Sequence, residues 1–107
     1  MGNTDRPLTD IVARRELDVR DSTQKVIVEL ARPYERSTGE FGCPYRIEWG
    51  QTVIQREIFG VDAFQALQLT LKMISFELHY EEELPIGRMY LFEGDDDIGF
   101  PKPDVAE

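Results

Sequence analysis

The longest regular alternation of apolar and polar positions covers residues 60–80, GVDAFQALQLTLKMISFELHY, and has the period of a helix. At about 100° per residue its apolar side chains form two rows, and a polar row separates them. The first apolar row is Phe64, Leu67, Leu71, Ile74 and Leu78. The second apolar row is Ala66, Leu69, Met73, Phe76 and Tyr80. The polar row, Gln65, Gln68, Lys72, Ser75 and His79, is predicted to face water. Because a surface helix normally carries one apolar row, this helix is predicted to be covered on two sides, with the first row on the sheet and the second row against another surface.

Capping residues define the ends of this helix. Asp62 is a suitable N-cap, since its carboxylate can accept hydrogen bonds from the first turn, and Gln65 stands where a capping box needs its reciprocal partner. The acidic run 81–83 places negative charge at the negative end of the helix dipole. Pro85 disfavours helix at the residue before it. The helix is therefore predicted to start at Asp62 and to end before Pro85.

Strand-like alternation precedes the helix four times and follows it once. The predicted strands are 9–19, 25–31, 43–49, 52–59 and 88–93, and residues 32–42 are predicted to be a loop. In the first strand one face is apolar, with Arg15 as the exception. That face consists of Ile11, Ala13, Leu17 and Val19. The order ββββαβ predicts an α+β fold, an antiparallel sheet of four to five strands with one long helix packed on one face.

Length and composition indicate one globular domain. The chain has 107 residues, of which 41% are apolar and 31% charged. We expect a flexible arm at 1–9, a single domain at 10–101 and a disordered tail at 102–107. The first ten residues lack the apolar stretch of a signal peptide, no apolar run reaches the ~20 residues of a membrane span, and there is a single cysteine. These features predict a cytoplasmic protein.

Negative charge is concentrated at the C-terminal end. The formal net charge is −9, and residues 77–107 contain ten acidic residues against Arg88 and Lys102. Because binding to phosphate groups needs a basic surface, nucleic acid is not expected as a partner. Membrane binding is not expected either. An acidic surface can bind a basic protein. Its candidate residues are Glu81, Glu82, Glu83, Asp95, Asp96 and Asp97.

No set of residues in the sequence forms a recognisable catalytic, cofactor-binding or metal-binding motif. His79 is the only histidine and lies on the polar row, where no nucleophile and orienting group accompany it. Cys43 has no histidine at a useful spacing. Asp95, Asp96 and Asp97 are consecutive, so their carboxylates point in different directions instead of converging on one ion. No cofactor or metal is therefore expected, and enzyme activity has no support.

Three short segments carry a family resemblance. They are CPYRI at 43–47, GVDAFQALQL at 60–69 and IGFP at 98–101. Together they resemble a family of short bacterial proteins classed as a domain of unknown function. The resemblance extends over residues 11–101 and implies a compact domain of this size. It implies no activity, substrate or cofactor.

Three functional hypotheses follow. The leading one is a non-enzymatic interaction domain that forms a homodimer, with Leu69, Met73, Phe76 and Tyr80 in the interface. The second is an inhibitor or immunity-type protein that binds a basic partner through its acidic residues. The third is a small-ligand binder or enzyme with a pocket between sheet and helix, which would use Tyr45, Trp49 or Cys43. The sequence leaves open whether a second subunit or the C-terminal segment covers the second apolar row.

Overall fold

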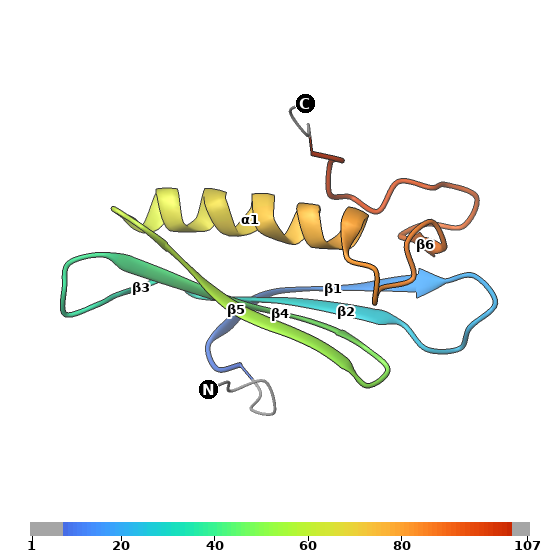
Figure 1. The fold of residues 1–107 in the computed structure, drawn as a ribbon, viewed down its shortest axis with the longest axis horizontal. Helices are drawn as coiled ribbons and strands as arrows, with labels where there is room; N and C mark the ends of the chain where they lie inside the picture. Colours follow the sequence, from blue (N-terminus) through green and yellow to red (C-terminus); the bar gives the residue numbers. More distant parts are fainter. Residues whose placement is uncertain (1–7, 104–107) are drawn as a thin grey trace.

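A computed structural model describes residues 8–103 as a curved antiparallel sheet with one helix lying across one of its faces (Figure 1). The elements are β1 (Ile11–Val19), β2 (Val26–Ala31), β3 (Tyr34–Glu35), β4 (Phe41–Trp49), β5 (Thr52–Gly60), α1 (Ala63–Tyr80) and β6 (Met89–Tyr90). The predicted α+β class, with one helix packed on an antiparallel sheet, is confirmed. The predicted arm 1–9 and tail 102–107 lie mostly outside the described residues, and both remain predictions.

The sheet has six strands where four or five were predicted. Its order across the main body is β5-β4-β2-β1-β6, and β3 pairs with the start of β4. The strand β3 and the first residues of β4 lie within 32–42, the predicted loop, because Tyr34 and Glu35 pair with Gly42 and Phe41. The last strand is two residues long instead of six and pairs with the end of β1. The connection β5–α1–β6 therefore crosses the sheet from one edge to the other.

The helix-facing side of the sheet forms the core. Its fully buried residues include Leu17, Val26, Tyr45 and Ile47. The predicted inward face of β1 is wrong at its first half, where Ile11 and Ala13 are exposed. The physical reason is the position of the helix. It packs chiefly against β4 and β5, so the beginning of β1 lies outside the area it covers.

The predicted N-terminal cap of the helix is confirmed. The Asp62 carboxylate accepts a hydrogen bond from the Gln65 backbone N–H at 2.8 Å. The reciprocal bond differs from a standard capping box, because Gln65 Oε1 accepts from the N–H of Val61, also at 2.8 Å, instead of from the N-cap residue. The helix ends at Tyr80, and Glu81 serves as its C-cap. It ends before Pro85, as predicted.

The rotation of the helix differs from the prediction. The buried face of the helix takes residues from both apolar rows and from positions between them, instead of following the first row alone. Its members are Ala66, Thr70, Ile74, Ser75, Glu77 and Leu78. The first row is consequently exposed in part, with Phe64 at 78% and Leu71 at 42%. Small residues explain this rotation. An added Cβ at Gly60 would lie 2.5 Å from the Ala66 backbone nitrogen, so the chain before the helix and the helix itself come into close contact there.

Candidate functional site

The second apolar row forms one half-exposed flank of α1. The exposed fractions of its large side chains are 39% for Leu69, 36% for Met73, 46% for Phe76 and 37% for Tyr80. The rings of Phe76 and Tyr80 lie 5.1 Å apart. Arg56 of β5 shares a hollow of about 330 Å³ with Met73, Phe76 and Tyr80, so this flank lies on the β5 side of the helix.

A buried polar cluster lies beneath this flank. Glu77 is only 4% exposed, and its Oε2 accepts hydrogen bonds from the Tyr45 hydroxyl and from Arg56 Nε, the latter at 2.7 Å. Burial, and then the bond to Glu77, raise the pKa of the Tyr45 phenol well above its usual value. The same carboxylate raises the pKa of Arg56. The other oxygen, Glu77 Oε1, is buried without a hydrogen-bond partner in residues 8–103.

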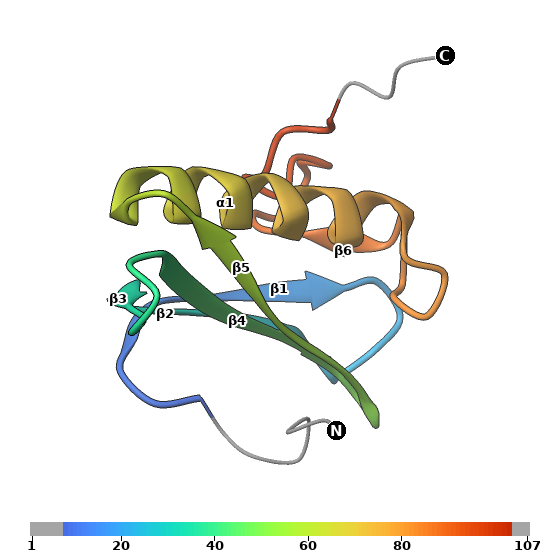
Figure 2. The same cartoon turned by 60° about the vertical axis from the view of Figure 1, so that its left-hand side comes forward.

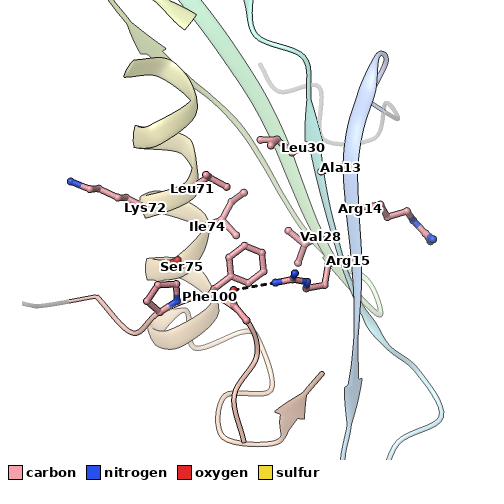
Figure 3. A pocket seen from close by; sticks show the side chains of 12 residues that line it. Ala13, Arg14, Arg15, Val28, Leu30, Leu71, Lys72, Ile74, Ser75 and Phe100 are labelled. Atoms are coloured by element: carbon pink, nitrogen blue, oxygen red, sulfur yellow. Dashed lines mark hydrogen bonds between the residues drawn. The ribbon is translucent and has the colours of Figure 1, made fainter. Parts of the chain in front are cut away.

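The opposite flank of α1 is covered by residues 98–103, the C-terminal segment. Ile98 is buried, and Arg15 Nη1 donates to the Gly99 carbonyl at 3.1 Å and to the Ile98 carbonyl at 3.5 Å. The Arg15 guanidinium also lies 4.9 Å from the centre of the Phe100 ring (Figure 3). Gly99 has a φ of +81°, and an added Cβ would lie 2.4 Å from Arg15 Nη1. The positive φ favours glycine at this position, and a Cβ there would displace the end of the Arg15 side chain.

The C-terminal segment thus contacts the flank of the first apolar row. A groove of about 480 Å³ remains between this segment, α1 and the two strands β1 and β2. On the other flank the segment reaches the second row only at its end, where Lys102 Nζ lies 5.9 Å from the centre of the Tyr80 ring. Leu69, Met73 and Phe76 of this row stay partly exposed in the described part of the chain.

The six predicted acidic residues come from two segments of the chain. Glu81, Glu82 and Glu83 follow the helix, whereas 95–97 belong to the loop after β6. Asp96 forms an ion pair with Arg20. The side chains of Asp95 and Asp97 accept from backbone N–H groups two residues further on, which is typical turn geometry. Within residues 8–103 no three metal-ligating side chains cluster. Binding of a basic partner remains a prediction.

The residues proposed for a pocket or for chemistry lie elsewhere. Cys43 and Tyr45 are fully buried, and neither of them nor Trp49 lines the two hollows described above. Burial raises the pKa of the Cys43 thiol, which keeps it in the unreactive protonated form. His79 Nδ1 lies 2.8 Å from the Ser75 carbonyl oxygen. Ser75, predicted to face water, is buried.

Sequence reasoning missed two residues of functional interest. In the sequence, Arg15 is the one charged residue on an otherwise apolar strand face. Such a residue is expected to bind an acceptor from a distant part of the chain. Glu77 is likewise a charged residue on a stripe of small residues, since it lies on the same side of the helix as Ala66 and Thr70. Both residues find their partners at sequence separations above 20 residues, and those partners could not be read from local spacing.

These features define a small two-layer α+β domain with one apolar flank exposed and one groove. The chain belongs to the family described as a domain of unknown function, DUF6968, which matches residues 13–102. Neither a curated protein nor a solved structure is significantly similar to it. In the part of the chain that the structure describes, the single helix is not long and apolar enough to cross a membrane.

Proposed function

We propose that this domain is a protein-interaction module that forms a homodimer through the second apolar row and the neighbouring edge of β5. The observation that carries the proposal is the continuity of the two surfaces. Four half-exposed apolar side chains lie on the flank of α1 that faces β5, and β5 is an edge strand (Figure 2). Contiguous exposed apolar surface of this kind is typical of an interface.

The strand β5 supports the proposal because it is long and has a partner strand along only one of its two edges in the described part of the chain. It has nine residues and pairs only with β4 among the described strands. A two-residue turn joins Trp49 and Thr52, so alternate residues from Thr52 onward bond to β4. The residues between them, Val53, Gln55, Glu57 and Phe59, direct their backbone groups to the open edge. Such an edge is a template for another strand.

A second copy of the chain suits this surface better than an unrelated partner. Two β5 strands related by a two-fold axis are antiparallel, which continues the antiparallel order of the sheet. The same axis brings the second apolar row against its own copy. Arg56, Glu77 and Glu81 line the hollow beside this row. Because Arg56 pairs with Glu77, Glu81 is the one further charge of this lining that a second copy meets.

The first prediction concerns the oligomeric state in solution. We expect the native protein to sediment as a dimer at tens of micromolar. Leu69→Glu should sediment as a folded monomer, because it places a charge in the apolar contact. Leu71→Glu is the matched control, since Leu71 has a similar exposed fraction, 42% against 39%, but lies on the opposite flank. It should remain dimeric.

A second variant tests the strand edge separately. The N–H of Val53 points away from β4, so Val53→Pro removes a donor from the open edge while leaving the β4–β5 pairing intact. We expect this variant to be monomeric as well. A native protein that sediments as a monomer at the same concentration would contradict the homodimer, and so would a Leu69→Glu variant that remains dimeric.

A further inference from the structure

The groove on the opposite flank has the size and lining of a small-molecule site. Its volume of about 480 Å³ lies within the range of roughly 300–1,000 Å³ that is usual for ligand pockets. Leu71 and Ile74 of α1 form one wall, and Val28 and Leu30 of β2 form the other (Figure 3). The Phe100 ring lies between the helix and Arg15 and closes one end of the groove. An apolar molecule can therefore enter between the two layers.

Arg15 gives this apolar groove a charged end. Of its three nitrogens only Nη1 donates to an acceptor in residues 8–103, namely the two backbone carbonyls of the C-terminal segment. Its Nε and Nη2 have no acceptor there, and no described carboxylate lies within 4.0 Å of the guanidinium. Among residues 8–103 this half-buried cation thus has no counter-ion, although the net charge of the protein is −9.

Two further cations lie beside the groove, and they differ in whether a described acidic residue pairs with them. Arg14 also borders the groove, but its side chain points away from it and pairs with Glu16 and Glu29 (Figure 3). Lys72 stands at the rim on α1, and none of the described acids forms an ion pair with it. The groove therefore combines apolar walls with unpaired positive charge, which is complementary to an anion attached to an apolar body.

We propose that this groove binds a small amphipathic carboxylate, with its apolar body between α1 and β2 and its carboxylate on Arg15. The Nε–Nη2 edge of a guanidinium carries two parallel N–H donors that match the two oxygens of a carboxylate. Because Nη1 is the nitrogen held by the C-terminal segment, that edge is left without an acceptor from residues 8–103. The groove lies on the flank opposite the proposed dimer contact, so a result that contradicts one proposal leaves the other unaffected.

Titration of the full-length protein with octanoate tests the site, with 1-octanol and octylammonium as matched probes of the same chain length. Binding is measured from the methyl NMR shifts of Leu71, Ile74, Val28 and Leu30. We expect saturable shifts with octanoate, an affinity about tenfold lower for 1-octanol because the charge-assisted pair is lost, and no binding of octylammonium. Equal affinities for octanoate and octylammonium would overturn the proposal.

Variants identify the residue that holds the carboxylate. Arg15→Gln should lower octanoate affinity to the level of 1-octanol, whereas Arg14→Gln, which changes a side chain pointing away from the groove, should leave it unchanged. Leu71→Asp adds a negative charge to a half-exposed wall position and should abolish octanoate binding even if Arg15→Gln fails to fold. Unaltered octanoate affinity in Arg15→Gln or Leu71→Asp overturns the proposal, as does the absence of groove shifts in the native protein.

Discussion

At the scale of single residues, the buried carboxylate of Glu77 is the most consequential side chain of the fold. Burying a charged group is costly unless hydrogen bonds and an opposite charge accompany it. Tyr45 and Arg56 provide both to the same oxygen, Oε2. Because Tyr45 comes from β4, Arg56 from β5 and Glu77 from α1, this cluster fixes the helix relative to two strands.

Removal of the phenol hydroxyl tests this role. Tyr45→Phe should lower the free energy of unfolding by about 1–3 kcal/mol, because a buried acceptor loses a donor. Tyr34→Phe is the matched control, since the Tyr34 hydroxyl also donates to a glutamate, Glu57, but at an exposed position. We expect it to cost less than about 0.5 kcal/mol. Urea unfolding of both variants gives the comparison, and equal losses would contradict a special role for Tyr45.

At the scale of elements, α1 shows how small residues determine packing. Most of the large apolar side chains lie on the two flanks, whereas the small residues Ala66 and Thr70 form the N-terminal half of the buried stripe. The Thr70 hydroxyl donates a hydrogen bond to the Ala66 carbonyl one turn earlier, at 2.7 Å. The helix can therefore lie close to β4 and β5 without leaving a buried polar group unpaired at this position.

The capping residue gives a prediction for this element. Asp62→Ala should destabilise the protein by about 1 kcal/mol, because the Gln65 N–H loses its acceptor. Asp62→Asn should stay within a few tenths of a kcal/mol of the native protein, since asparagine caps helices comparably. Thermal or urea unfolding measures both changes. A large loss in Asp62→Asn would indicate that the charge of Asp62, and not its cap, stabilises the helix.

At the scale of the whole molecule, the C-terminal segment makes the two flanks of α1 different. It covers the side facing β1 and β2, where Arg15 and Ile98 hold it, and leaves the side facing β5 open. The proposed dimer contact and the proposed ligand groove both follow from this asymmetry. The C-terminal segment leaves the flank that faces β5 uncovered, and it covers the flank that faces β1 and β2 only in part.

A pair of glycine variants tests the attachment of this segment. Gly99→Ala should loosen residues 98–103, because its Cβ would displace Arg15 Nη1, which donates to the Ile98 and Gly99 carbonyls. Gly94→Ala is the matched control, since Gly94 has nearly the same φ, +83° against +81°, but open space around its Cβ. Both variants carry the backbone cost of about 1 kcal/mol, and only Gly99→Ala adds the clash. Hydrogen exchange should therefore accelerate at 98–100 in Gly99→Ala alone.

The sequence by itself determined which elements form and where the long ones lie. Periods of two and 3.6 residues predicted four of the strands and the helix, and Asp62 predicted its first turn, because these signals depend on neighbours within a few positions. The pairing of Tyr34 and Glu35 with β4 escaped prediction. Two residues are too few to show a period, and only the partner strand makes them a strand.

Only the tertiary structure decided which face of the helix is buried and what covers its flanks. The pattern of residues 60–80 assigned the first apolar row to the sheet, whereas the buried face takes residues from both rows. The choice depends on the close contact of Gly60 with Ala66 and on the Tyr45–Glu77–Arg56 cluster, which joins three elements. Contacts between segments distant along the chain set this rotation, and local periodicity contains no information about them.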